Sequence, residues 1–272
     1  MLDALRLGVE LPAVPVGGPQ EAEGVLPALR ACADAAEAAG AGAVWLGAGS
    51  PGGHAADPCV LAGALGAVAS RVVVGVIDRL EGRVPAVLAR DVAAAHLVSG
   101  GGGALLLSLS GDRARPGTDP TGRLLEAAAI CRAVLAGELP VFTGAHFRLG
   151  GGAVRPAPPP RRRPALVVAV EGDLWTSPPT GKLSELGSLV DAVAVGGGPE
   201  RVAALAAALG PAPRPWLVWR GTPPPDGGAL AGRLRDAGAD GLLVQPAGRP
   251  AVGEWASAVA EALGPTVVGL AR

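Results

Sequence analysis

Two glycine-containing motifs are the first places in this sequence where residue type and spacing suggest chemistry. The run Gly47-Ala48-Gly49-Ser50-Pro51-Gly52 matches the GxGxxG pattern with which dinucleotide-binding proteins hold a pyrophosphate. That chemistry requires a helix to begin inside the loop, so that its N-terminal amides meet the phosphates. Here Pro51-Gly52-Gly53 continues the turn, and the next helix is expected only from Asp57. The motif therefore argues weakly for a dinucleotide site.

The second motif, Thr180-Gly181-Lys182-Leu183-Ser184, resembles the end of a P-loop. Thr176 occupies the position where a P-loop needs its upstream glycine, and Leu183 follows Lys182 where a P-loop needs a serine or threonine. A nucleotide triphosphatase is therefore not indicated. A helix N-terminus that carries a glycine and a cation still suits a phosphate group. The alternative is an ordinary helix start with a surface lysine.

The three histidines are scattered along the chain. His54 is the catalytic candidate, because it follows the second expected strand, where a barrel places its active-site groups. His96 lies inside an expected helix and His146 in an irregular segment. Spacing alone assigns no Ser/His/Asp arrangement and no paired carboxylates.

The cysteines give no sign of a metal site or of a disulfide framework. Cys32, Cys59 and Cys131 are far apart, and each lies in an Ala- and Leu-rich helical context. We interpret them as small buried hydrophobic residues.

The elements that must position these residues alternate regularly. Eight apolar, β-rich runs are expected as strands: Leu5–Leu11, Gly42–Leu46, Val72–Ile77, Ala104–Leu109, Ala165–Val170, Val190–Val195, Trp216–Trp219 and Gly241–Val244. Helical stretches separate or follow them: Glu21–Ala39, a helix opened by Asp57-Pro58, Val84–Val98, Thr121–Gly137, Lys182–Leu189, Pro199–Leu209, Gly228–Ala237 and Gly253–Leu263. Such alternation predicts parallel βαβ units.

The alternation predicts an α/β fold, a closed (β/α)₈ TIM barrel. An open doubly wound sheet has the same local pattern, but eight regular units without a second domain favour closure. No fixed period recurs, which argues against a helical repeat protein. We expect a single domain over residues 1–272, with an excursion at about 138–163. The excursion holds the extended stretch Val141–Leu149 and ends in Arg161-Arg162-Arg163, interpreted as a solvated loop.

Length and composition agree with this fold. The chain has 272 residues, and a barrel of this kind needs ~250. The formal net charge of -1 gives no nucleic-acid footprint, and no apolar run reaches the ~18 residues of a membrane span. The N-terminus lacks the pattern of a signal peptide, so we expect a cytoplasmic protein.

Several ordered motifs resemble the bacterial luciferase-like, flavin-dependent monooxygenase family. The most specific begins at Arg83-Val84-Pro85 and continues into Ser99-Gly100-Gly101, similar to the family's "R-x-P … S-G-G" pattern. Asp57-Pro58 is similar to the start of its second helix. Further on, Gly144 and Phe147 resemble its "G-x-x-[FY]" motif, and Gly181-Lys182-Leu183 its short fifth helix. The order of these motifs over most of the chain carries the resemblance.

The resemblance implies a luciferase-like barrel that binds reduced FMN or the deazaflavin F420 at its C-terminal mouth. The Ala-, Gly- and Arg-rich composition favours F420. The ring would lie near Gly75-Val76-Ile77 and near Ser108 and Ser110, at the end of the fourth strand. The phosphate tail would approach Glu171-Gly172 and Thr180-Gly181-Lys182. The cofactor would supply hydride transfer or oxygen activation toward a small organic substrate, while the protein orients it. Family resemblance also suggests a homodimer through the early helices, around Leu61–Ala69.

Three departures from the family pattern motivate other functions. Gly47-Ala48-Gly49 stands where members often place a histidine or an acidic residue. Around the Ser-Gly-Gly motif, His96 replaces an aspartate and Gly102 an arginine, and the loop Gly111–Pro116 is short. These changes fit a non-catalytic barrel that has lost its cofactor site and acts as a binding or partner protein. A phosphate-binding barrel lyase or isomerase is a third reading, motivated by Ala239-Asp240-Gly241.

Overall fold

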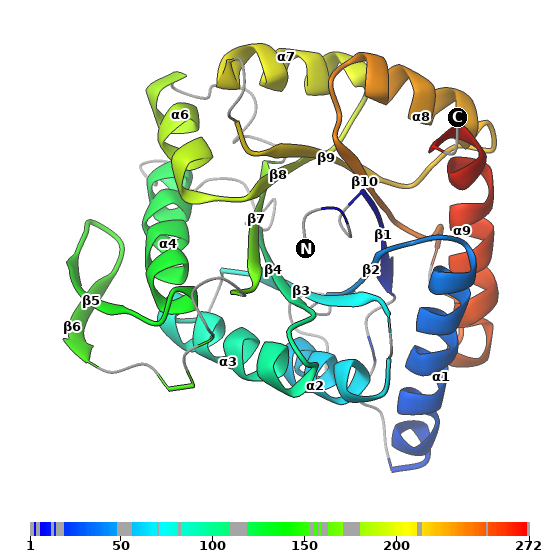
Figure 1. Ribbon diagram of the computed structural model, residues 1–272, viewed down its shortest axis with the longest axis horizontal. Helices are drawn as coiled ribbons and strands as arrows, with labels where there is room; N and C mark the ends of the chain where they lie inside the picture. The colour runs from blue at the N-terminus through cyan, green and yellow to red at the C-terminus, as the bar shows by residue number, and fades with distance from the viewer. Residues whose placement is uncertain are drawn as a thin grey trace.

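A computed structural model describes residues 3, 6–11, 14, 19–47, 56–69, 71–80, 83–108, 119–152, 155–156, 158, 163–170, 180–210, 214–248 and 250–270. Within these residues, eight parallel strands form a closed barrel in the order β1-β10-β9-β8-β7-β4-β3-β2 (Figure 1). The barrel strands are β1 (Leu7–Leu11), β2 (Ala43–Gly47), β3 (Val73–Arg79), β4 (Gly103–Ser108), β7 (Ala165–Val170), β8 (Ala192–Val195), β9 (Trp216–Gly221) and β10 (Gly241–Val244). The predicted closed barrel is confirmed, and the open doubly wound sheet is wrong.

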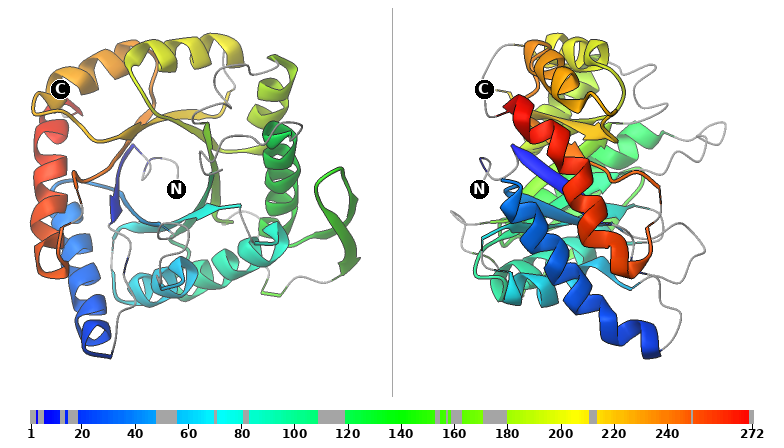
Figure 2. Two further views of the ribbon diagram at one scale, coloured as in Figure 1. Left: turned by 180° about the vertical axis from the view of Figure 1, so that it is seen from behind. Right: turned by 90° about the vertical axis from the view of Figure 1, so that its right-hand side faces the viewer.

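Helices surround the barrel and slant across its outer face (Figure 2). They are α1 (Pro19–Ala38), α2 (Pro58–Val68), α3 (Pro85–Val98), α4 (Pro120–Leu135), α6 (Thr180–Leu189), α7 (Pro199–Leu209), α8 (Gly227–Asp236) and α9 (Trp255–Leu270), with the 3₁₀ turn η3 (Val252–Glu254) before the last. Asp57 caps α2 as predicted, since its carboxylate accepts the backbone N–H of Cys59 at 2.8 Å. None of the described helices is both long and apolar enough to cross a bilayer.

Strand alternation divides the apolar side chains into two layers. One layer faces the helices and includes Val44, Val74 and Val168. The other fills the barrel interior and includes Trp45, Ile77 and Leu106. Successive strand residues point to opposite faces. A residue two positions along a strand from a member of one layer therefore faces the same side as that member.

The indole of Trp45 fills the middle of the barrel. It is 3% exposed and lies against two glycines on the neighbouring strands, Gly8 of β1 and Gly75 of β3. A Cβ at Gly75 would overlap the six-membered ring, and a Cβ at Gly8 would lie 2.9 Å from the indole nitrogen Nε1. β1 and β3 carry glycine at these positions because the indole of Trp45 occupies the space that their side chains would otherwise fill.

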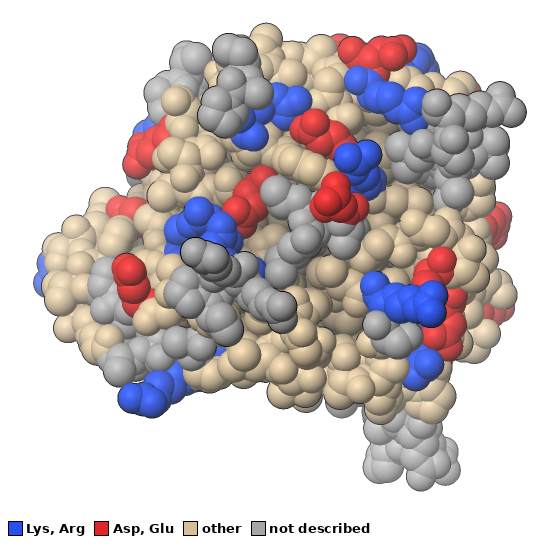
Figure 3. All heavy atoms as spheres, viewed as in Figure 1, with Lys and Arg blue, Asp and Glu red and all other residues tan. Residues whose placement is uncertain are grey.

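The N-terminal ends of three strands are held by side-chain acceptors. Asp191 accepts the N–H of Leu166 in β7 at 2.8 Å, and Asp240 accepts the N–H of Leu217 in β9 at 2.8 Å. His96 does the same for Gly103 in β4, through Nδ1 at 3.0 Å. In Figure 3, which views this end of the barrel, acidic and basic side chains lie next to one another. The replacement by His96 thus concerns a strand anchor at the end opposite the carboxyl ends of the strands.

Arginines neutralise the two aspartate anchors. Arg163 binds Asp191 at 2.6 Å, and Arg214 binds Asp240 at 2.7 Å. The side chain of Arg163 is only 19% exposed, so the interpretation of the triple arginine as a solvated loop is wrong for this residue. Arg161 and Arg162 lie outside the described residues.

The excursion between α4 and β7 forms an antiparallel hairpin, β5 (Leu139–Thr143) and β6 (Arg148–Gly152). The carboxylate of Glu126 on α4 accepts the backbone N–H groups of Ala145, His146 and Phe147 at 2.7–2.9 Å. A Cβ at Gly144 would overlap this carboxylate. The G-x-x-F motif therefore anchors the hairpin to α4, and the sequence had shown only one extended stretch there.

The three described cysteines are buried and unpaired, as the sequence predicted. Burial raises the pKa of the Cys32 and Cys59 thiols to about 12 in each case. Neither thiol is therefore a nucleophile at neutral pH.

The packing of Trp45 yields a stability prediction. Gly75→Ala should lower the free energy of unfolding by about 1–3 kcal/mol, because its methyl group overlaps a ring that fixed strands surround. The matched control is Gly232→Ala in α8, where no atom lies within 4 Å of the added Cβ. Removing a helical glycine there should raise the free energy of unfolding by about 0.4–1 kcal/mol. Equal effects in urea denaturation would show that Trp45 does not constrain β3.

Candidate functional site

The carboxyl ends of the barrel strands, here called the mouth, carry a set of polar side chains on the inner face. Ile77 and Val218 belong to the interior layer, so Arg79 and Arg220, two residues further along β3 and β9, also face inward. Glu10 on β1 follows Gly8, whose face contacts the interior Trp45. Ser108 ends β4 on the same face as Leu106.

Glu10, Arg220 and Gln245 form one hydrogen-bonded network across neighbouring strands. Arg220 donates to Oε2 of Glu10 from Nε at 3.2 Å and from Nη2 at 2.8 Å. Gln245, just after β10, donates Nε2 to the same oxygen at 2.8 Å. The side chains of Arg220 and Glu10 are 12% and 19% exposed, so the pair is largely shielded from water and holds a fixed geometry.

The glycine at the end of β2 lies beside the other carboxylate oxygen of Glu10. A Cβ at Gly47 would lie 3.3 Å from Oε1 of Glu10. In barrel order β2 lies between β1 and β3, so Gly47 separates Glu10 from Arg79 without a side chain. The carboxylate of Glu10 and the guanidinium of Arg79 therefore lie on the two strands that flank Gly47.

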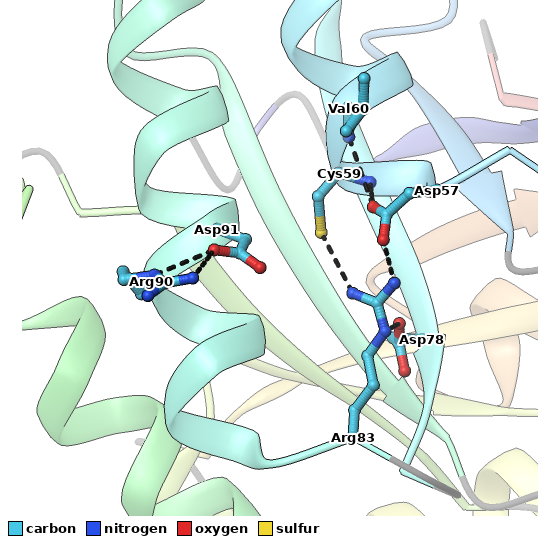
Figure 4. Close-up of polar contacts among 7 residues, drawn as sticks. All are labelled: Asp57, Cys59, Val60, Asp78, Arg83, Arg90 and Asp91. Carbon is cyan, nitrogen blue, oxygen red and sulfur yellow. Dashed lines mark hydrogen bonds and ion pairs between the residues drawn. The ribbon is translucent and has the colours of Figure 1, made fainter.

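A second polar cluster lies outside the barrel wall, between β3 and the helices. Arg83 contacts the carboxylate of Asp57 at the start of α2, and its Nε lies 3.4 Å from Oδ2 of Asp78 in β3. The Sγ of Cys59 is 3.9 Å from Nη1 of the same guanidinium. Figure 4 shows Arg83 reaching between the two aspartates, while the Arg90–Asp91 pair lies apart on α3. Arg83, the arginine of the R-x-P motif, thus joins β3 to α2.

The two carboxyl groups of this Arg83 cluster differ in protonation. Burial raises the pKa of Asp78 to about 6, although Arg83 opposes the shift. For Asp57, desolvation also acts upward, but hydrogen bonds from Arg83 and from the N–H groups of Cys59 and Val60 hold the pKa below its ordinary value. Asp78 is therefore a carboxyl group that the fold keeps partly neutral near pH 6.

The residues predicted near the cofactor ring take different positions. Gly75 lies beneath the Trp45 indole, and Val76 belongs to the layer that faces the helices. Ile77 faces the interior, and Ser108 faces the mouth, where its hydroxyl donates to the carbonyl oxygen of Asp78 at 3.4 Å. Of the described residues that were predicted at the ring, Ile77 and Ser108 are the ones that direct side chains inward near the mouth. Their role in binding stays a prediction.

The predicted phosphate residues Thr180, Gly181 and Lys182 form the first turn of α6. The ammonium group of Lys182 lies 2.7 Å from Oδ2 of Asp119, the residue that caps α4. The hydrogen bond from Lys182 is the main cause that holds the pKa of Asp119 below its ordinary value. Lys182 thus joins the starts of two helices at the mouth side. His54, Ser110, Glu171 and Gly172 lie outside the described residues.

Sequence reasoning missed Glu10, Arg79, Arg220 and Gln245. A signal was present, because Glu10 and Arg220 are single charges near the carboxyl ends of otherwise apolar strands, in LGVEL and WLVWRG. A charge at such a position in a barrel faces either the mouth or the helices, and the alternation of the strand decides which.

The closed barrel, with its polar inner groups at the carboxyl ends of the strands, defines a TIM-barrel protein whose candidate site lies where that fold carries active sites. The family profile described as luciferase-like monooxygenase matches residues 5–263. The chain therefore belongs to the luciferase-like monooxygenase family. No curated protein matches the sequence.

Solved structures share this fold at low sequence identity. The coenzyme F420-dependent tetrahydromethanopterin reductase from Methanopyrus kandleri has a TM-score of 0.68 and 12% identity, with 97% of this chain and 99% of the reductase covered. Monooxygenase RslO1 from Streptomyces bottropensis has a TM-score of 0.65 and 18% identity, with 96% and 99% covered.

The EDTA monooxygenase EmoA from Chelativorans sp. BNC1 is a longer relative. It has a TM-score of 0.58 and 18% identity, with 85% of this chain covered. The match spans 65% of the length of the EDTA monooxygenase.

The raised pKa of Asp78 predicts a pH-dependent stability. Between its ordinary pKa of 3.8 and about 6, the folded state keeps the proton that the unfolded chain has released. The contribution of Asp78 is thus fully present below about pH 4 and is lost as the pH rises through 6. Asp78→Asn removes this titration, so the stability of the variant relative to the native protein should rise by on the order of 2 kcal/mol between pH 4 and pH 7.

Urea denaturation at a series of pH values measures this difference. Asp34→Asn, at an exposed position of α1, controls for the loss of one negative charge. A constant difference between Asp78→Asn and the native protein across this range would contradict the prediction.

Proposed function

We propose that this chain is a flavin- or F420-dependent oxidoreductase or monooxygenase that acts on a small organic substrate at the mouth. The observation that carries the proposal is the inward-facing network of Glu10, Arg220 and Gln245 in a barrel of the luciferase-like family. A fixed carboxylate and guanidinium at this end of the barrel provide directed hydrogen-bonding groups in a partly water-excluded setting.

The residues of the mouth fit a flat ring cofactor. Glycines at the rim, Gly47 at the end of β2 and Gly196 after β8, present backbone without side chains. Ser108 contributes a hydroxyl group on the inner face, and the first turn of α6 contributes backbone amides beside Lys182 for a phosphate. A bound flavin or F420 would supply the hydride or the electrons for oxygen.

The chain's own polar groups would orient the substrate against that ring. Oε1 of Glu10 lies beside Gly47 and accepts a hydrogen bond or a proton from the substrate. Arg220, held by Glu10 through two nitrogens, keeps the carboxylate in place. Glu10 on β1 thereby offers the acidic group that family members often place after the second strand, where this chain has Gly47.

The competing function is a non-catalytic barrel that has lost its cofactor site. The burial of Gly75 beneath Trp45 and the outward orientation of Val76 favour it, because two of the three residues predicted at the ring offer it no side chain. Cofactor binding decides between the two functions.

Separate titrations with FMN and with F420 test the proposal. We expect saturable quenching of the fluorescence of one of them at a stoichiometry of one per chain. Gly196→Phe should weaken this binding about tenfold or more, because it adds a ring to the rim. Gly150→Phe, on the hairpin with no atom within 4 Å of its added Cβ, is the matched control. Absence of quenching with both cofactors would leave the non-catalytic barrel.

We also propose that two copies of the chain pair through α2 and α3. Val60, Ala64, Ala67 and Val68 are exposed along α2 at helical spacing, and Val60 is 69% exposed. Exposed valines and Leu97 continue this apolar face onto α3. A face of small, uncharged side chains packs against its own copy without charge repulsion.

The oligomeric state in solution tests this pairing. The native chain should elute as a dimer in size-exclusion chromatography with light scattering, and Val60→Glu should shift it to a monomer by placing two like charges in the interface. Val141→Glu on the hairpin, where Val141 is 78% exposed, should leave the dimer intact. A native monomer would contradict the proposal.

A further inference from the structure

Arg79, the last residue of β3, differs from five other arginines around the barrel in its contacts with carboxylates. It is partly buried on the inner face of the mouth. Five other arginines around the barrel each contact a carboxylate: Arg83, Arg132, Arg163, Arg214 and Arg220. Within the described part of the chain, no hydrogen bond or ion pair engages the guanidinium group of Arg79.

Among the residues that the structure describes, the charges of the inner mouth leave one positive charge without a counter-charge. Glu10 neutralises Arg220 directly at 2.8 Å, and Gln245 is neutral. Asp78 is the neighbour of Arg79 in sequence, but it faces the helices and contacts Arg83. Among the described inner residues at the ends of the strands, the charge of Arg79 therefore has no counterpart, and a partly desolvated cation favours an anion.

Barrel order places Arg79 across the mouth from Arg220. The strands β3 and β9 are four apart in the closed ring, so Arg79 and the network around Arg220 lie on opposite sides of the mouth. The neighbouring rim residue on β2 is Gly47, which has no side chain to block the approach. A ligand between the two sides would meet a free guanidinium on one side and the fixed network on the other.

We propose that the mouth recognises a small organic anion, whose carboxylate, sulfonate or phosphate group pairs with the guanidinium of Arg79 while its body lies toward Glu10 and Arg220. The planar guanidinium offers two parallel N–H donors, which match the oxygens of these groups. The assignment of this anion as the substrate rests on the proposed function, whereas the binding of the anion does not. The phosphate of a cofactor has the same chemistry, so the test must separate the two sources.

Benzoate and benzamide are suitable probes, because they have the same shape and differ in charge. Isothermal titration at constant ionic strength should show the native protein binding benzoate at least tenfold more tightly than benzamide. Arg79→Gln should abolish this preference, and Arg79→Lys should retain part of it. Arg148→Gln, an exposed arginine on β6 without a partner among the described residues, is the matched control and should leave the preference unchanged.

Two results would overturn the proposal: equal binding of benzoate and benzamide by the native protein, or an unchanged preference in an Arg79→Gln variant that melts like the native protein. A parallel titration with FMN and riboflavin identifies the source of the anion. If Arg79→Gln removes the preference for FMN over riboflavin and leaves that for benzoate, Arg79 holds the cofactor, and its assignment to the substrate is wrong. Benzoate preference without any cofactor binding would instead count against the proposed function alone.

Discussion

The position of one indole ring governs the interior of this barrel. Trp45 lies across Gly8 and Gly75, so three strands are packed around a single side chain and can approach no differently. Close packing of this kind tolerates little change of volume.

The charged side chains have different roles at different levels along the barrel axis. At the N-terminal ends of the strands, Asp191 and Asp240 each combine a backbone N–H with an arginine, which satisfies the charges and fixes the strands. Outside the wall, Arg83 ties β3 to α2 through Asp57 and Asp78. At the mouth, Glu10 and Arg220 pair with each other, and Arg79 has no counter-charge among the residues that the structure describes. The paired charges hold strands together, whereas Arg79 is available for the recognition that we propose.

Several of the motifs that resemble the luciferase-like family have structural roles in this chain. Asp57 caps a helix and contacts Arg83, and Gly144 makes room for the carboxylate that anchors the hairpin. His96 holds the start of β4, as an aspartate carboxylate would also do. These structural roles fit a fold that is shared with solved structures at 12–18% identity. Function in such a fold depends on the rim and cannot be read from the barrel alone.

The sequence by itself determined the eight strands, their order with the helices, the cap at Asp57 and the burial of the cysteines. These follow from local patterns, namely apolar runs, capping residues and periodicity, which act over a few residues. It did not show the hairpin pairing, the burial of Arg163 or the network at the mouth. Glu10 meets Arg220 and Gln245 from more than 200 residues away, and only closure of the barrel brings β1 beside β10. That closure decided which charges become partners, because an ion pair depends on distance in space. It also decided that Arg79 has no partner among the described residues, since strand alternation fixes the face of a side chain only once the register is set.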